Sequence, residues 1–123
     1  MIQLAKAEGA KCILATAGTD EKTKLCESLG ATHGINYKKT DWGEEVKKLA
    51  PQGVDLIVDF ILGTPSQTPE VNGQGQGYLE RDLQVAARDA TIVLLAMLGG
   101  GKLDNFDAGA ILYKRLAVYP CRG

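Results

Sequence analysis

The chain has 123 residues, a length that allows one small domain with a sizeable core but not two. Its net charge of −1 and isoelectric point near 5.8 leave no electrostatic footprint for nucleic acid or an anionic membrane. With 45% hydrophobic and 24% charged residues, the composition is that of a soluble globular protein, and we expect a cytoplasmic location.

Apolar residues repeat with a helical period in some segments and form short continuous runs in others. A helical period with capping residues indicates a helix, and a run of about four to eight apolar residues fits a buried strand. In chain order, these patterns predict a helix at 2–9, a strand at 12–16, a helix from 19 or 20 to 30, a strand at 33–37, a helix at 42–49, a strand at 54–60, a helix at 78–87, a strand at 91–96, a helix at 107–112 and a strand at 116–119.

The predicted strands are apolar along their whole length and alternate with helices. This pattern is typical of a parallel sheet that is covered on both faces, with right-handed crossovers. We therefore expect an α/β fold: a partial doubly wound, Rossmann-like parallel sheet with helices on both faces. The same alternation occurs in many proteins, so it selects a fold class and no function.

Two segments interrupt the alternation. Residues 64–77 lie between a predicted strand and its helix, and their two prolines and three glycines cannot form the interior of either. Strand-to-helix connections usually have about two to six residues, so this segment is an insertion or a lid over a site, and we favour the insertion. Residues 119–123 end the chain where a doubly wound fold would be expected to continue.

The end of the first predicted strand carries the residues that favour a cofactor site. Ligands of doubly wound sheets bind beyond the carboxyl ends of the strands, and here Gly18 and Thr19 follow the strand, with Lys22 shortly after. An acid at the strand tip would bind the ribose hydroxyl groups of NAD, whereas hydroxyl groups and a lysine can accommodate a 2′-phosphate as hydrogen-bond donors. The same residues also form an ordinary helix N-cap with a solvated lysine, and spacing alone leaves both interpretations open.

Two further strand ends carry weaker signals. Residues 99–101 are three glycines, which either let a ligand approach the backbone or only turn the chain. No helix follows them at the distance that a dinucleotide fingerprint requires. Tyr37 ends the second strand and is either a packed aromatic ring or a ligand contact.

The remaining polar residues do not form a recognisable catalytic set, and no catalytic residue is assigned. His33 precedes a strand without an evident carboxylate partner, so we expect it at the surface. Asp55 and Asp59 face one side of a strand, where capping of the strand end is as reasonable as acid–base chemistry. The lysine pairs at 38–39 and 47–48 lie close to acids, and we expect solvated helix faces.

The three cysteines, Cys12, Cys26 and Cys121, include no CxxC pair and have only His33 as a partner for a metal, so no metal site is predicted. An odd, widely spaced set suits reduced thiols better than a disulfide framework. Cys12 lies in an apolar run, and we expect it to be a small core residue.

Taken in order, several segments resemble the cofactor domain of zinc-free medium-chain dehydrogenase/reductases, the alcohol dehydrogenase-like C-terminal domain, in the quinone oxidoreductase branch. The resemblance covers nearly the whole chain except residues 64–77 and the last few. Each segment is weak alone, but their combination is fairly specific. The segments are Ile2-Gln3-Leu4-Ala5, Ala15-Thr16-Ala17-Gly18-Thr19 with Lys22, Leu29-Gly30-Ala31, Gly34-Ile35-Asn36-Tyr37-Lys38, Gly53-Val54-Asp55-Leu56-Ile57-Val58-Asp59 and Leu98-Gly99-Gly100-Gly101.

This resemblance implies hydride transfer from NADPH to quinones or to related activated carbonyls and alkenes, without catalytic zinc. It implies that Lys22 and Tyr37 contact the 2′-phosphate and that the segment containing Met97 lies near the nicotinamide. The small-molecule substrate would be a quinone or an enone, and a homodimer is possible in such a family. The implied cofactor-binding residues are Gly18, Thr19, Lys22, Tyr37, Met97 and Gly99.

The chain also departs from the family pattern. The family's glycine-rich phosphate loop, its preceding strand and the catalytic domain belong before Met1. We therefore expect residues 1–123 to be a partial NADP-binding domain with an insertion at 64–77, and to have no appreciable reductase activity alone. The alternative is a non-catalytic α/β module that binds a nucleotide or a protein. A flavodoxin-like or receiver-like domain would need an acidic cluster at the strand ends, which this sequence lacks.

Overall fold

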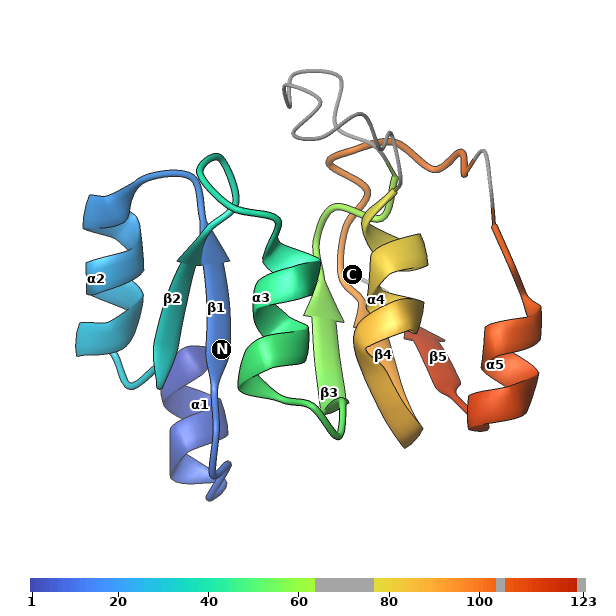
Figure 1. Ribbon diagram of the computed structural model, residues 1–123, viewed down its shortest axis with the longest axis horizontal. Helices are drawn as coiled ribbons and strands as arrows, with labels where there is room; N and C mark the ends of the chain where they lie inside the picture. Colours follow the sequence, from blue (N-terminus) through green and yellow to red (C-terminus); the bar gives the residue numbers. More distant parts are fainter. Residues whose placement is uncertain (64–76, 104–105, 122–123) are drawn as a thin grey trace. The chain divides into compact units, whose positions relative to one another are not determined.

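A computed structural model describes residues 1–63, 77–103 and 106–121 of the chain. Parallel strands alternate with helices along the chain (Figure 1), which confirms the α/β, Rossmann-like fold class. The chain divides into two compact units, Met1–Glu45 and Val46–Gly123, and each is described by itself.

The first unit pairs two short strands. It contains α1 (Ile2–Ala7), β1 (Leu14–Ala17), α2 (Asp20–Ser28) and β2 (His33–Asn36). β1 and β2 are parallel, and their register runs from Leu14 opposite His33 to Ala17 opposite Asn36. The carboxyl ends of both strands therefore lie at the same edge of the sheet (Figure 1).

Helix α2 begins where its sequence predicts. Thr19 has an extended backbone and is the N-cap, and its Oγ1 accepts a hydrogen bond of 3.2 Å from the backbone N–H of Lys22. Thr23 is buried on the face toward β2, where a methyl group on Gly34 would lie 2.6 Å from the Thr23 carbonyl oxygen. The absence of a side chain at Gly34 thus lets α2 lie directly on β2.

The second unit is built on a three-stranded parallel sheet with the order β3-β4-β5. Ile92, in the central strand, is completely buried, as expected for a parallel strand covered by helices. The strands are β3 (Val54–Asp59), β4 (Ala86–Leu94) and β5 (Ala117–Pro120). The helices of this unit are α4 (Tyr78–Val85) and α5 (Gly109–Lys114). Helix α3 (Trp42–Leu49) spans the boundary between the two units. The core cluster consists of Leu79, Leu83, Ala86, Ala90, Ile92 and Leu116.

The boundary between α4 and β4 differs from the prediction. The sequence predicts a helix to Ala87 and a strand from Thr91, but the strand already begins at Ala86. Ala86 is buried and pairs with Val54 of β3, so packing against the neighbouring strand overrides the helix preference of the two alanines. Asp89 then takes a left-handed backbone conformation with φ of 63°, at an irregularity in the pairing of β3 and β4.

Two other expectations about single residues were wrong, and one lies largely outside the described residues. Cys12 is exposed and precedes β1, because the strand begins only at Leu14. Lys38 and Lys39 lie in the turn after β2 and not on a helix, whereas Lys47 and Lys48 are exposed on α3 as expected. The insertion predicted at 64–77 falls on residues that are not described, except for Gly77, which is the N-cap of α4.

Candidate nucleotide site at the strand ends

Four of the predicted cofactor residues lie at one edge of the first unit. Gly18 and Thr19 directly follow β1, Lys22 lies in the first turn of α2, and Tyr37 directly follows β2. Because β1 and β2 are parallel neighbours, these positions share the carboxyl edge of the sheet. This edge is where doubly wound sheets bind their ligands.

Gly18 and Tyr37 form the centre of the site. A methyl group on Gly18 would lie 2.8 Å from the Tyr37 Oη and 3.2 Å from Cζ, too close for any side chain at this position without a shift of the ring. The backbone N–H of Tyr37 donates to the Ala17 carbonyl oxygen over 3.2 Å and holds the tyrosine beside the turn. The phenol therefore rests against bare backbone, with its hydroxyl group at the edge of the sheet.

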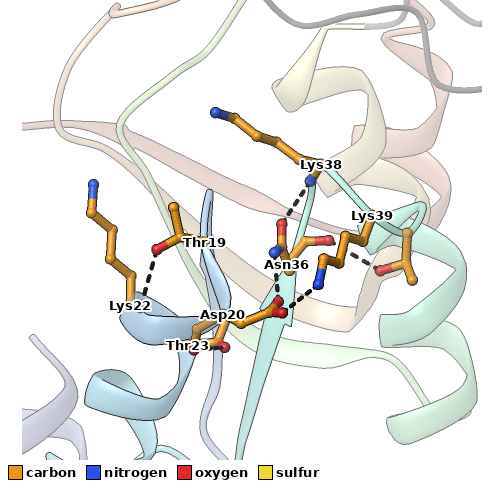
Figure 2. A network of polar contacts seen from close by, with 8 residues as sticks. Thr19, Asp20, Lys22, Thr23, Asn36, Lys38 and Lys39 are labelled. Carbon is orange, nitrogen blue, oxygen red and sulfur yellow. Dashed lines mark hydrogen bonds and ion pairs between the residues drawn. The ribbon is translucent and has the colours of Figure 1, made fainter.

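Thr19 and Lys22 combine the two roles that the sequence leaves open. The Thr19 hydroxyl oxygen caps α2, so the capping interpretation is confirmed. Within the part of the chain that the structure describes, the Lys22 ammonium group has no hydrogen-bond or ion-pair partner (Figure 2). Its role as a ligand contact stays a prediction.

Lys38 also belongs to this site, and sequence reasoning missed it. Its Cε would lie 3.5 Å from a methyl group on Gly18, so its side chain passes over the same turn as the Tyr37 ring. Among the described residues the Lys38 ammonium group has no partner, and it extends away from Asp20 (Figure 2). The signal in the sequence was its position directly after Tyr37 at a strand end.

An exposed network around Asp20 fixes the turn that carries Tyr37 and Lys38 (Figure 2). Asp20 forms an ion pair with Lys39 and accepts a hydrogen bond of 2.7 Å from the Asn36 side-chain amide. The Asn36 amide oxygen in turn accepts from the backbone N–H of Lys38 over 3.0 Å. The hydrogen bonds from Lys39 and then Asn36 hold the pKa of Asp20 below its usual value.

This network decides which cations remain for a ligand. Asp20 engages the Lys39 ammonium group, whereas those of Lys22 and Lys38 are not engaged by any described residue. The acid nearest in sequence to the strand tip is thus already bound to protein donors. Two ammonium groups and a phenol hydroxyl are donors that can bind a phosphate, so the residues present fit a phosphate-bearing cofactor.

The other predicted cofactor residues, Met97 and Gly99, lie in the second unit, in the loop after β4. Met97 is 67% exposed, and Gly99 donates its N–H to the Ile61 carbonyl oxygen over 2.8 Å. A methyl group on Gly99 would lie 2.6 Å from the Gly63 carbonyl oxygen. The glycine is therefore required for contact between two loops, and a role beside a cofactor stays a prediction.

The polar residues without an assigned role divide by exposure. His33 is exposed, as expected. Asp55 is exposed as well, whereas Asp59 is only 4% exposed and accepts hydrogen bonds from the backbone N–H groups of Ile61 and Leu62. Of the two interpretations of this pair, capping of the strand end is the one that Asp59 fulfils.

Residues 1–63, 77–103 and 106–121 present neither a metal site nor a membrane-spanning helix. No three histidine, cysteine, aspartate or glutamate side chains there are grouped so that they could hold a metal ion. The described residues therefore do not fit a zinc site. None of the described helices is long and apolar enough to cross a membrane.

Comparison with known proteins connects this geometry to one family. The family model described as zinc-binding dehydrogenase matches residues 1–123. The chain is 39% identical over 109 residues to the trans-enoyl reductase pgmF of Aspergillus terreus, and 29% identical over 107 residues to quinone oxidoreductase-like protein 2 of Rattus norvegicus. These alignments cover 85% and 86% of this chain but only 26% and 27% of the relatives, so the chain spans about a quarter of their length.

Solved structures show the same relation. The Escherichia coli quinone oxidoreductase complexed with NADPH superimposes on 98% of this chain with a TM-score of 0.71 and 25% sequence identity. The match covers 33% of that protein. The similarity thus extends over both units of this chain and over one part of a larger enzyme.

Proposed function

The chain belongs to the zinc-binding dehydrogenase family of oxidoreductases, and from this premise we propose that it forms the NADP-binding part of an NADPH-dependent reductase. The observation that carries the proposal is the pair of unengaged ammonium groups, on Lys22 and Lys38, beside the Gly18–Tyr37 contact. A 2′-phosphate brings two negative charges to this edge, and cations there offset them.

Each residue of the site has a distinct task in this proposal. Gly18 leaves space for the Tyr37 ring against the backbone, and Tyr37 donates its hydroxyl hydrogen to the phosphate. Lys22, in α2, and Lys38, after β2, supply point charges. Thr19 fixes the start of α2, and therefore the position of Lys22.

The preference for NADPH over NADH follows from the charges. A dinucleotide fold that binds NAD places a free carboxylate where it can accept from the ribose hydroxyl groups. The acid that follows the tip of β1 in this chain is Asp20, which Lys39 and Asn36 engage. The remaining donors are complementary to a phosphate and leave a ribose hydroxyl without an acceptor.

For the protein as a whole, we propose hydride transfer to a quinone or to a related enone. Relatives carry the names quinone oxidoreductase-like protein and trans-enoyl reductase, and both substrate types have an electrophilic carbon conjugated to a carbonyl group. NADPH supplies the hydride when it is bound, and this chain contributes residues that bind and orient the cofactor. Consumption of NADPH in the presence of a quinone measures this activity, and we expect no appreciable turnover by residues 1–123 alone.

Calorimetric titration of the 123-residue chain tests the cofactor proposal. We expect NADPH to bind more tightly than NADH, and Lys22→Ala or Lys38→Ala to weaken NADPH binding by about tenfold each, since a charge-assisted hydrogen bond contributes about 1.5–3 kcal/mol and exposure reduces it. Both variants should leave the affinity for NADH unchanged. Lys24→Ala is the matched control, because Lys24 is an exposed lysine of the same helix that is two residues from Lys22 and thus on another face.

Two results would contradict the proposal. One is tighter binding of NADH than of NADPH by the wild-type chain. The other is an unchanged affinity for NADPH in both lysine variants, which would leave Lys22 as a helix residue in solvent.

A further inference from the structure

Two carboxyl groups, those of Asp59 and Asp82, lie together in the interior of the second unit. Neither is part of the nucleotide site described above. Asp59 ends β3 and is 4% exposed, and Asp82 lies in the middle of α4 and is 3% exposed. The Asp82 side chain is close enough to Asp59 for the charge of Asp59 and a hydrogen bond to it to act on the pKa of Asp82. Two buried carboxylates repel each other, so such a pair needs a physical explanation.

Asp59 acts as an acceptor through both of its oxygens. Its Oδ1 accepts from the backbone N–H groups of Ile61, over 2.7 Å, and Leu62, over 3.1 Å, and its Oδ2 also lies 3.1 Å from the Leu62 nitrogen. Leu62 has a left-handed backbone with φ of 63°, a conformation that residues other than glycine adopt rarely. The Asp59 carboxylate thus holds a turn that the chain would otherwise leave.

Asp82 is in the opposite situation. Its Oδ2 is buried and, by ordinary pairing of donors with acceptors, has no hydrogen-bond partner among the described residues. An ionised carboxylate has no hydrogen to give, so two ionised groups cannot satisfy each other. A protonated Asp82 resolves both problems, because it removes one charge and donates to Asp59.

The turn that Asp59 holds is bonded to the loop after β4. The backbone N–H of Gly63 donates to the Gly100 carbonyl oxygen over 3.0 Å, and that of Leu98 donates to the Phe60 carbonyl oxygen over 3.1 Å. Gly99 donates to Ile61 in the same way. Backbone hydrogen bonds therefore join residues 60–63, which Asp59 caps, to residues 98–100.

We propose that Asp82 is a positioning residue that stays protonated in the folded chain and donates its hydrogen to the Asp59 carboxylate, so that Asp59 holds residues 60–63 and, through them, residues 98–100. This assignment rests on the proposed function only in its consequence, that the pair orients the loop of Met97 and Gly99 for a cofactor. The contacts themselves do not depend on any ligand.

The surroundings of Asp82 support this protonation. Burial, followed by the charge of Asp59 and the hydrogen bond to it, raises the pKa of Asp82 to about 9. No cation offsets this effect among the groups that act on Asp82. The neighbouring charged groups are engaged elsewhere, since Glu80 of α4 accepts from the Gly77 N–H and Lys114 of α5 donates to carbonyl oxygens at the end of α4.

Two variants of Asp82 distinguish a role as a hydrogen-bond donor from a role in packing alone. Asp82→Asn keeps the shape and a donor for Asp59 but cannot ionise. Asp82→Leu keeps the branching and the number of side-chain heavy atoms and has no donor. The amide of Ile92, in the buried central strand of the same unit, serves as an internal control for unfolding of that unit.

Carbon-detected NMR of the 123-residue chain, without any nucleotide, tests the proposal directly. We expect the side-chain carboxyl carbon of Asp82 to titrate with a midpoint of about 9, and the backbone signals of Ile61 and Leu62 to shift with the same midpoint in the wild type but not in Asp82→Asn. In Asp82→Leu the amide hydrogens of Ile61 and Leu62 should exchange with solvent about tenfold faster, whereas Asp82→Asn should stay within about twofold of wild type.

Titration of Asp82 in the range of an exposed aspartate would overturn the proposal. So would unchanged exchange at Ile61 and Leu62 in a folded Asp82→Leu chain. If the second unit of Asp82→Leu does not fold, as the Ile92 amide would reveal, the wild-type titration and its absence from Asp82→Asn decide alone. All these signals are recorded without NADPH, so a failure here and a failure of the proposed cofactor site are separate results.

Discussion

The two units contain an aspartate in opposite surroundings, and each aspartate acts on a loop that follows a parallel strand. Asp20, in the first unit, is exposed and binds Lys39 and the Asn36 amide, which together lower its pKa. Asp82, in the second unit, is buried, and a second carboxyl group is the charged neighbour that acts on it, so its pKa rises. Exposure and the sign of the neighbouring charge thus decide whether an aspartate of this chain serves as an acceptor or as a donor.

The difference predicts opposite responses to pH. A pKa that is raised in the folded state, as at Asp82, contributes stability that is fully present below the unfolded value of about 3.8. This contribution is lost as the pH rises through about 9. A lowered pKa, as at Asp20, stabilises the fold above about 3.8 and is lost as the pH falls through the lower folded value. Buried and exposed aspartates of this chain can therefore be told apart by a stability profile.

The largest effect on stability is expected from Asp82→Asn. At pH 7 the folded chain must keep Asp82 protonated while the unfolded chain ionises it, and each unit of pKa is worth about 1.4 kcal/mol. The amide needs no proton, so we expect the free energy of unfolding at pH 7 to rise by on the order of a few kcal/mol. Urea denaturation between about pH 5 and about pH 9 measures this free energy of unfolding, which should decline less with pH in the variant than in the wild type.

Asp55→Asn is the matched control for this prediction, because Asp55 is an exposed aspartate of the same unit, in strand β3. We expect its unfolding profile to follow that of the wild type. Destabilisation of the chain by Asp82→Asn at every pH would mean that Asp82 acts as a carboxylate, and it would contradict the difference between Asp82 and Asp20.

A smaller effect is expected from Lys114→Met in the second unit. The Lys114 ammonium group donates to the carbonyl oxygens of Leu83, Gln84 and Ala86 over 2.7 to 3.0 Å, where α4 ends and leaves its last carbonyl groups without helical partners. Its loss should lower the free energy of unfolding by about 1–2 kcal/mol, given what hydrogen bonds to charged groups contribute and the partial exposure of this one. Thermal unfolding of Lys114→Met, with Lys102→Met as an exposed control, measures the difference. Equal midpoints for the two variants would show that the carbonyl groups are satisfied by water.

The smallest effect on stability is expected from Asp20→Asn in the first unit. The pair with Lys39 is exposed and screened by salt, so the variant should unfold at nearly the wild-type midpoint. Its effect should instead appear as release of Lys39 and movement of the turn after β2, seen as shifts of the Lys38 and Tyr37 amide signals. A loss of stability as large as in Lys114→Met would contradict the small contribution that we expect from the exposed Asp20–Lys39 pair.

Much of the fold could be predicted from the sequence, because local signals and tertiary packing agree along most of the chain. Thr19 is an N-cap both by residue type and by position, and α3 has the predicted bounds. The start of β4 could not be predicted, because alanines at 86 and 87 continue a helical pattern and only pairing with Val54 turns them into a strand. Cys12 was misplaced for a related reason, since an apolar run does not say at which residue a strand begins.

The candidate site was predictable in part. Gly18 and Tyr37 meet as expected for adjacent strand ends. Lys38 could not be distinguished from Lys39 by sequence, because their difference lies in the partner that Asp20 provides to one of them. Asp82 did leave a signal, since it shares a helical face with Leu79 and Leu83, so a charged residue interrupts an apolar stripe.

The central claim is that the edge beside Gly18 recognises a 2′-phosphate. The most direct measurement compares adenosine 2′,5′-bisphosphate with adenosine 5′-monophosphate by NMR titration of the wild-type chain, since the two ligands differ only in that group. We expect tighter binding of the bisphosphate, with shifts at Gly18, Lys22, Tyr37 and Lys38 that the monophosphate does not cause. Equal binding of both ligands, or shifts confined to other residues, would contradict it.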